Sequence, residues 1–246
     1  MPEVTPLRFS IVLPCYNEAG TLPSLFARFS EVVGSRSDIE ILFVNNGSND
    51  NSATVFANEL TQPGRSWARL VGVPINQGYG FGILAGLREA RGEFIGWTHA
   101  DSQYDPAIVV EGFQHLTAAV QPGRSFLQGR RVKRNWFDSI FTAGMTVVAR
   151  LMLGAEVSDI NAQPKLFPRS FLELMRHPPK DFSLDLYALF LARRNGYEQL
   201  YIPVHFGRRL HGDAKGGGSL PLKWKLTKRT WAFMRQLRRD IRAGRI

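Results

Sequence analysis

The sequence predicts an α/β fold in which a mixed, mostly parallel sheet is flanked by helices. Short apolar segments with strand character alternate with longer segments of helical pattern, an order typical of parallel strands joined by crossover helices. Polar loops follow several of the apolar segments, which places ligand-binding side chains at the carboxyl edge of the sheet. With 246 residues, 44% of them hydrophobic, the chain can form one large domain or one domain with an appendage.

The first half contains the regular alternation. The expected strands are 9–14, 39–44, 69–73 and 94–97, and the expected helices are 17–33, 50–60 and, after a glycine-rich turn, 78–90. The glycines of that turn lack the spacing of the dinucleotide-binding fingerprint.

The second half is less regular. Its expected helices are 106–119, with Asp105 as the N-cap, a long one over 137–153, and 182–194. Its expected strands are 125–129, 166–167 and 200–204, and 207–219 is expected to be a glycine-rich loop.

A cluster of oxygen-bearing side chains follows the buried segment 94–97. Asp101 and Gln103 lie two residues apart on an extended segment, so their side chains point the same way. Carboxylate and amide oxygens suit Mg²⁺ or Mn²⁺, which shares its remaining ligands with water and substrate phosphates. The alternative is a polar turn that only caps the helix beginning near residue 106.

Three further loops have the chemistry of a nucleotide site. They are Pro14-Cys-Tyr-Asn-Glu18, Asn45-Asn-Gly-Ser-Asn-Asp50 and Asn76-Gln-Gly-Tyr-Gly80. Tyr16 can stack on a base, Glu18 can accept hydrogen bonds, and the amide of Asn45 or Asn46 can pair with a base edge. Residues 45–50 also suit a tight turn followed by an N-cap, and both interpretations can hold together.

The cysteine content and the N-terminal segment favour a cytoplasmic protein. Cys15 is the only cysteine, which excludes an internal disulfide framework and fits a reducing compartment. Its place at a strand end indicates packing rather than nucleophilic catalysis. Residues 1–8 do not resemble a signal peptide.

The excess of positive charge lies near the C-terminus. The formal net charge is +10, and residues 208–246 hold twelve Lys or Arg against Asp213 and Asp240, so the remainder is balanced. Residues 220–242 mix these charges with Trp224, Trp231 and aliphatic side chains, which predicts an amphipathic helix at an anionic membrane surface. A spanning helix needs about 20 mostly uncharged residues, which this segment lacks. The alternative is a helix packed on the domain with a solvated basic face.

Four motifs occur in a fixed order: Phe9-Ser-Ile-Val-Leu-Pro-Cys-Tyr-Asn-Glu18, Val44-Asn-Asn-Gly-Ser-Asn-Asp50, Asn76-Gln-Gly-Tyr-Gly80 and Thr98-His-Ala-Asp-Ser-Gln103. As a set they resemble the family 2 glycosyltransferases of GT-A fold. The similarity covers about residues 9–215 and is greatest to the dolichol-phosphate mannose synthase group and its bacterial polyprenyl-phosphate relatives. It implies sugar transfer from a nucleotide sugar to a polyprenyl (dolichyl or undecaprenyl) phosphate, with inversion at the anomeric carbon and Mg²⁺ or Mn²⁺ on the donor diphosphate.

The resemblance also implies roles for residues of the donor side. Asp101 and Gln103 match the metal positions, and the expected donor-binding residues are Pro14, Tyr16, Glu18, Asn45, Asn46, Asn76, Gly78, His99, Ala100 and Asp101. The group usually has Asp-Ala-Asp where this chain has His99-Ala-Asp101, and Asp-Asp-Gly-Ser where it has Asn45-Asn-Gly-Ser48. His99 contacts metal or phosphate in one interpretation and is held by its own loop in the other.

On the acceptor side, Arg130 matches a phosphate-binding position of the group. Lys133, Thr142 and Lys165 are also expected to bind the acceptor, although Asp138 stands where a second arginine is usual. Arg209 and Lys215 match a loop near the phosphates of both substrates. Asp101, Arg130, Arg209 and Lys215 are therefore the expected catalytic residues.

These observations predict a glycosyltransferase domain over 1–219, with a nucleotide-sugar half to about 105 and an acceptor half from about 106, followed by a basic amphipathic tail over 220–246. The expected location is peripheral, on the cytoplasmic face of a membrane, with a membrane-anchoring protein as a further candidate partner. Two alternatives remain. A saccharide or protein acceptor requires a general base, for which Asp185 and Asp159 are candidates. A non-catalytic protein would use its basic tail on nucleic acid, which we do not expect, or on an assembly partner.

Overall fold

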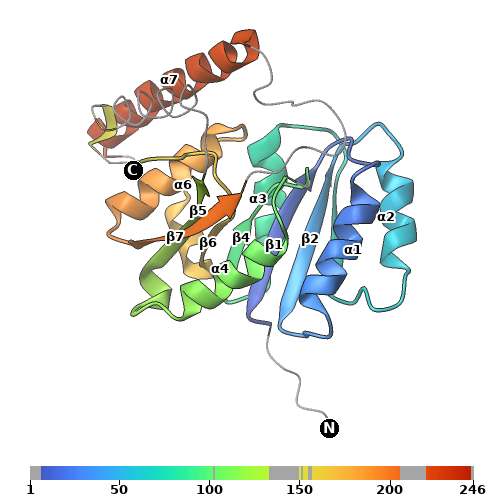
Figure 1. Cartoon of the computed structure of the whole chain (residues 1–246). Helices are drawn as coiled ribbons and strands as arrows, with labels where there is room; N and C mark the ends of the chain where they lie inside the picture. Colours follow the sequence, from blue (N-terminus) through green and yellow to red (C-terminus); the bar gives the residue numbers. More distant parts are fainter. Residues whose placement is uncertain are drawn as a thin grey trace.

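A seven-stranded mixed sheet forms the centre of the described part of the molecule (Figure 1). The computed structural model describes residues 7–101, 103–132, 150, 152–154, 157–205 and 220–244, without the side chains of 220–227. The expected loop over 207–219, and nearly all of the expected helix over 137–153, lie outside these residues. The strands are β1 (Phe9–Cys15), β2 (Ile39–Asn46), β3 (Ala68–Val73), β4 (Phe94–Trp97), β5 (Ser125–Val132), β6 (Lys165–Pro168) and β7 (Glu198–His205).

The strand order is β3-β2-β1-β4-β6-β5-β7. Strands β1 to β4 pair in parallel, β6 runs antiparallel to both β4 and β5, and β7 is parallel to β5. The register pairs Val12 with Trp97 and Cys15 with Asn45, so β1, β2 and β4 end at the same edge. The predicted mixed, mostly parallel sheet is confirmed.

Helices cover both faces of the sheet. On one face α1 (Leu22–Val33), α2 (Ser52–Leu60) and α4 (Ala107–Thr117) bury apolar side chains in a common cluster. On the other face α3 (Tyr79–Glu89), α6 (Ser183–Arg194) and part of α7 (Leu220–Arg242) form a second cluster. Two 3₁₀ helices, η1 (Pro122–Arg124) and η2 (Arg169–Leu174), complete the regular elements of the described chain.

Helix α1 begins five residues later than predicted. Asn17 has φ of 56°, outside the helical region, and its backbone N–H donates to Ser48 Oγ at 3.0 Å. The next N–H, of Glu18, donates to Ser52 Oγ at 3.1 Å. Residues 17–21 therefore form a loop held by the segment that follows β2.

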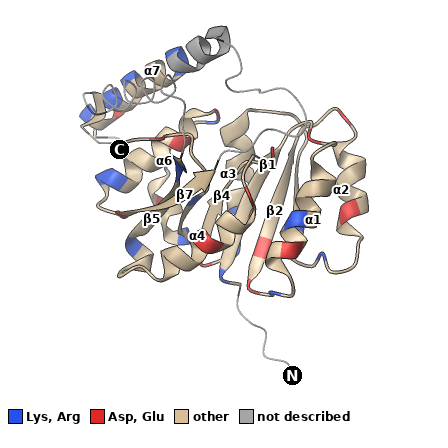
Figure 2. Cartoon of the chain, in the orientation of Figure 1, with Lys and Arg blue, Asp and Glu red and all other residues tan. Residues whose placement is uncertain are grey.

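Helix α7 has the predicted bounds and packs on the domain. Met234 and Leu237 are 0% and 1% exposed, and the ring of Phe233 lies 6.3 Å from that of Tyr187 in α6. Lys228 and Arg229 are exposed, and Trp231 is 46% exposed. Figure 2 shows several Lys and Arg positions along the described part of α7. The helix thus combines a packed apolar face with a basic outer face. Among the described helices, none is long and apolar enough to cross a membrane.

Candidate active site

The sequence-predicted donor residues lie at the carboxyl ends of β1 and β2, at the start of α3 and in the loops that follow β1, β3 and β4. Parallel strands that share a register end at one edge, so the loops after β1, β2 and β4, the first, second and fourth along the chain, meet at the carboxyl end of the sheet (Figure 1). Tyr16, Glu18 and Asn45 are half-buried at this edge, Asn46 is buried, and Asn76 is exposed.

Hydrogen bonds join the first two loops. Besides the bond from Asn17 N–H to Ser48, the backbone N–H of Asn49 donates to Asn17 Oδ1 at 2.9 Å and the Asn17 amide donates to Asn49 Oδ1 at 2.7 Å. The N–H of Ala19 donates to Asp50 Oδ2 at 3.2 Å. The loop after β1 therefore takes its shape from the loop after β2.

Gly47 fixes the third loop against the second. It has φ of 68°, and a Cβ built on it would lie 2.3 Å from the backbone N of Asn76 and 2.7 Å from the carbonyl carbon of Ile75. The Asn46 amide donates to the carbonyl of Gly78 at 3.0 Å, and Asn76 Oδ1 accepts from Gly78 N–H at 2.8 Å. Three loops distant in sequence thus form one interlocked surface.

The loop after β4 brings Asp101 to the same edge. Asp101 is 8% exposed, and its Oδ1 accepts the backbone N–H of Gln103 at 3.2 Å. The His99 ring centroid lies 5.7 Å from that of Tyr79 and 6.0 Å from that of Tyr104. Burial lowers the pKa of His99, against the opposite effect of the nearby Asp101, which favours a neutral imidazole.

The donor set fits a divalent cation only if the cation has other ligands. One carboxylate, an amide and a neutral imidazole belong to this loop. No group of three or more His, Cys, Asp or Glu side chains in the described chain is arranged to hold a metal ion alone. Mg²⁺ and Mn²⁺ usually bind through one or two carboxylates with water and substrate phosphates, and the residues present fit that kind of site.

Strand β5 separates its two arginines onto opposite faces of the sheet, as strand alternation requires. Arg130 is exposed, with its guanidinium 5.7 Å from the ring centroid of Tyr201. The backbone N–H of Arg131 donates to Asp159 Oδ2 at 2.8 Å, and its guanidinium donates to the carbonyl of Asn161 at 2.9 Å. The other expected acceptor-side residues, Lys133, Thr142, Arg209 and Lys215, lie outside the described residues.

Lys165 differs from its expected position. Its side chain is 0% exposed, and Nζ lies 2.8 Å from Asp185 Oδ1. The same ammonium donates to the carbonyls of Ile160 at 2.8 Å and Ala162 at 2.9 Å. The structure thus gives Lys165 a buried partner in place of the exposed position expected of a residue that binds the acceptor phosphate.

The two carboxylates considered as general bases, Asp185 and Asp159, both accept hydrogen bonds from buried or half-buried protein groups. Asp185 is 1% exposed, and besides Lys165 its Oδ1 accepts from Trp97 Nε1 at 3.1 Å and Gln163 Nε2 at 2.9 Å. Asp159 is 8% exposed and accepts from the backbone of Arg131. Neither has the open, unpaired position of a base that takes a proton from a sugar hydroxyl.

Sequence reasoning missed Gln163, Trp97 and Arg131 as parts of this region. Alternation in the strand predicts that Arg130 and Arg131 face opposite ways, but it does not say which faces the site. Gln163 and Trp97 carry no local signal, because they meet only through Asp185, 22 and 88 residues away.

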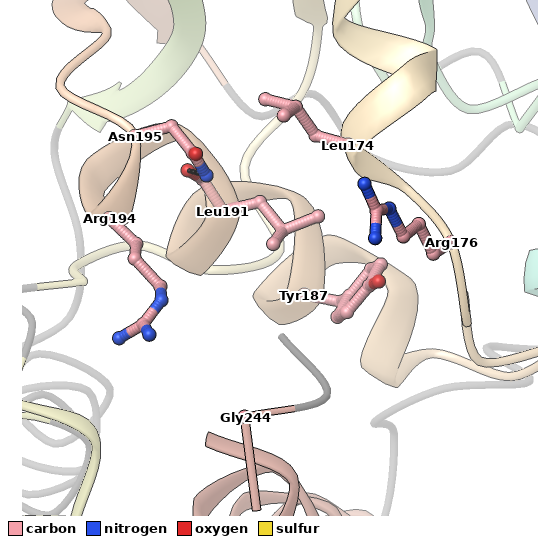
Figure 3. A pocket seen from close by; sticks show the side chains of 7 residues that line it. All are labelled: Leu174, Arg176, Tyr187, Leu191, Arg194, Asn195 and Gly244. Carbon is pink, nitrogen blue, oxygen red and sulfur yellow. Dashed lines mark hydrogen bonds between the residues drawn. The ribbon is translucent and has the colours of Figure 1, made fainter. Parts of the chain in front are cut away.

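A cavity of about 250 Å³ lies elsewhere, between η2, α6 and the end of α7 (Figure 3). Its lining includes Arg176 and Arg194, which stand on opposite sides, with Tyr187 and Leu191 of α6 between them. Among the sequence-predicted site residues that the structure describes, none lines this cavity, so it is separate from the described part of the carboxyl-edge site.

Comparison with known proteins gives one family and one fold. A model of the family described as "Glycosyl transferase family 2" matches residues 10–185. The chain is 28% identical over 215 residues to the undecaprenyl-phosphate 4-deoxy-4-formamido-L-arabinose transferase of Enterobacter sp. (strain 638), covering 85% of this chain. It spans only 62% of the length of that relative.

Solved structures with the same architecture include glucosyl-3-phosphoglycerate synthase from Mycobacterium tuberculosis. Its complex with Mn²⁺, uridine diphosphate and phosphoglyceric acid has a TM-score of 0.71 at 19% identity, covering 94% of this chain and 78% of that one. Its complex with phosphoglyceric acid alone has a TM-score of 0.67 at 17% identity, covering 92% and 78%. These likenesses confirm the predicted GT-A fold.

Proposed function

Because the chain belongs to glycosyl transferase family 2, we propose that it transfers a sugar from a nucleotide sugar to a polyprenyl phosphate, with inversion at the anomeric carbon. We choose this acceptor mainly because Asp185 forms an ion pair with Lys165 and Asp159 accepts a hydrogen bond from Arg131. Neither carboxylate is therefore placed to act as a general base. A phosphate monoester is already ionised near pH 7, so its attack needs positioning and charge stabilisation more than proton removal. The similarity to an undecaprenyl-phosphate sugar transferase supports the same class of acceptor.

On the donor side, the interlocked loops supply the nucleotide-binding surface. Tyr16 stacks on the base, Glu18 accepts from the ribose or base, and Asn45 pairs with a base edge. Pro14, Asn46, Asn76, Gly78, His99 and Ala100 complete the donor-binding set. Asp101, with Gln103, holds Mg²⁺ or Mn²⁺, which when bound offsets negative charge on the departing nucleoside diphosphate.

On the acceptor side, Arg130 binds the lipid phosphate. Its guanidinium is exposed on β5, and a planar guanidinium suits bidentate contact with phosphate oxygens. The resemblance to the polyprenyl-phosphate group adds Lys133, Thr142, Arg209 and Lys215. Lys165 is assigned no direct contact with the acceptor, because its ammonium is buried.

A lipid acceptor places the enzyme at a membrane surface, and α7 offers the matching chemistry. Its exposed residues include Lys228, Arg229 and the half-exposed Trp231, a combination suited to an anionic headgroup layer. In Figure 1, α7 and the loops after β1 and β2 lie at the end of the molecule opposite the N-terminus. We propose peripheral attachment at the cytoplasmic face, with the active site directed toward the bilayer.

The test is sugar transfer from a panel of nucleotide sugars to a short polyprenyl phosphate, with Mn²⁺ or with chelator. Asp101→Asn is compared with the matched control Asp105→Asn. The N-cap of α4 is Pro106 rather than the predicted Asp105. Asp105 is exposed, its Oδ1 accepts the backbone N–H of Ala107 at 3.0 Å, and it pairs with Arg28 at 2.9 Å.

We expect Mn²⁺-dependent transfer from one donor, a loss of about a hundredfold or more in Asp101→Asn, and near-normal rates in Asp105→Asn. Transfer to 3-phosphoglycerate without transfer to the lipid would contradict the proposed acceptor. Equal activity with chelator and with Mn²⁺ would contradict the proposed metal.

A further inference from the structure

We infer that Asp185, paired with Lys165, is a positioning residue for the proposed transfer, and that the charge of this pair sets the placement of the donor loops relative to β5 and the turn before β6. The inference rests on the proposed function for its kinetic consequences, while its structural basis is independent of the acceptor. Neither residue is accessible to a substrate, since their side chains are 0% and 1% exposed.

A single carboxylate oxygen receives three donors from two segments, β4 and residues 163–165. Asp185 Oδ1 accepts from Trp97 Nε1 at 3.1 Å, Gln163 Nε2 at 2.9 Å and Lys165 Nζ at 2.8 Å. Asp185 lies in the first turn of α6, where the helix dipole favours a negative charge. The carboxylate is therefore held both by the lysine and by the helix that carries it.

The first of these segments leads directly to the metal loop. Trp97 is the last residue of β4, and its side chain is 0% exposed in the core. His99 and Asp101 follow two and four residues later. The indole bond to Asp185 thus fixes the point from which the Asp101 loop departs.

The second segment leads to the acceptor side. The two carbonyls that accept from Lys165 belong to Ile160 and Ala162, so the ammonium holds the turn before β6. Asp159, at the start of this turn, accepts the backbone N–H of Arg131 at 2.8 Å in β5. The position of β5 next to Arg130 therefore depends on the turn over 159–162, which the Lys165 ammonium holds in place.

Gln163, two residues before Lys165, connects the pair to the donor loop that ends at α3. Gln163 Nε2 also lies 3.3 Å from the hydroxyl of Tyr79, the first residue of α3. The Tyr79 ring stacks on Phe182, just before α6, with centroids 4.6 Å apart and planes 12° apart. The N–H of Phe81 donates to the carbonyl of Lys180 at 3.0 Å. The start of α6, which carries Asp185, is therefore packed on the start of α3.

This arrangement makes a specific prediction about charge. Removing one partner of a buried pair leaves an uncompensated charge, which the loops must move to solvate, whereas removing both leaves a neutral core. Lys165→Met and Asp185→Asn alone should therefore displace the loops, and Lys165→Met/Asp185→Asn should displace them less.

The matched control is Glu40→Gln. Glu40 is 3% exposed, pairs with Arg69 at 2.7 Å, and accepts from Ser10 Oγ at 2.7 Å and Arg91 N–H at 2.8 Å. Ser10 and Glu40 lie at the amino ends of β1 and β2, at the far edge of the sheet from the proposed site. The control thus disrupts another ion pair with a buried carboxylate, although its Arg69 is 27% exposed, without touching the loops.

The experiment measures three quantities on the full chain: the melting temperature, the Kd for UDP or GDP with Mn²⁺ by calorimetry, and kcat for transfer to polyprenyl phosphate. We expect each single variant to raise Kd about tenfold and lower kcat about a hundredfold, because displacement of about 1 Å has effects of that size. The double variant should be about tenfold more active than Lys165→Met, and Glu40→Gln should change only the melting temperature.

Two results would overturn the inference. Single variants that melt earlier, as Glu40→Gln does, but keep Kd and kcat would show that the pair serves stability alone. If the double variant had a kcat no higher than that of Asp185→Asn, while Lys165→Met kept the kcat of the wild type, the carboxylate would act without the lysine. If the wild type transfers no sugar to polyprenyl phosphate, the proposed function fails, and unchanged Kd values in the single variants would separately refute the inference.

Discussion

Gly47→Ala tests the packing that joins the donor loops, and the structure supplies a matched control. At Gly47, φ is 68° and an added Cβ would lie 2.3 Å from the backbone N of Asn76. At Gly64, φ is 76° and nothing lies within 4 Å of the added Cβ. Gly64→Ala therefore carries the conformational cost alone, and Gly47→Ala carries that cost and the displacement of a neighbouring backbone.

The left-handed conformation costs an L-residue roughly 1–2 kcal/mol relative to glycine. Overpacking against atoms that cannot rotate away adds roughly 1–3 kcal/mol. We therefore expect Gly64→Ala to lower the free energy of unfolding by about 1–2 kcal/mol and Gly47→Ala by about 2–5 kcal/mol, measured by urea denaturation with unchanged m-values. Calorimetry should also show that only Gly47→Ala weakens nucleotide binding, because only Gly47 touches the third loop. Equal losses of stability in the two variants, with equal nucleotide affinity, would refute the reasoning.

Three other predictions concern the helix, the thiol and pH. Met234→Ala should lower the free energy of unfolding by roughly 2–5 kcal/mol, because the Met234 side chain is 0% exposed. Trp231→Ala should change the free energy of unfolding little and should weaken co-sedimentation with anionic vesicles. Equal losses of stability in the two variants would contradict the packing of α7. Burial raises the pKa of the Cys15 thiol, so a disulfide reagent at pH 8 should label it only after unfolding, and rapid labelling of the native protein would contradict its burial. The hydrogen bond from Arg36 lowers the pKa of Asp38 in the folded state, so the stability advantage over Asp38→Asn should be full above about pH 4 and disappear as the pH falls further; an advantage independent of pH would refute it.

The sequence was sufficient to predict elements with strong local patterns. The strand expected over 94–97 is β4 with the same bounds, because an apolar run there is limited by glycine and polar residues. The predicted start of α1 was wrong because the backbone N–H groups of Asn17 and Glu18 donate hydrogen bonds to Ser48 and Ser52, which are 31 and 34 residues away. A local pattern contains no information on such partners.

The same distinction applies to the site. Parallel strands end together, so the donor loops could be assigned to one edge from their order alone. The burial of Lys165 could not be predicted from the sequence, because a lysine in a polar segment normally lies at the surface. Its buried position depends on Asp185, which comes 20 residues later on another element. Pairing across elements decides which charged residues face a substrate and which support the site from behind.

The measurement that tests the central claim most directly compares acceptors that differ only in the phosphate. The wild-type enzyme, with Mn²⁺ and its preferred nucleotide sugar, is given a short polyprenyl phosphate or the corresponding polyprenol, and products are identified by mass spectrometry. The account predicts a glycosylated polyprenyl phosphate and no product from the polyprenol, because the attacking oxygen must already be ionised. Comparable transfer to the polyprenol would mean that a general base operates in the site, and would contradict the claim.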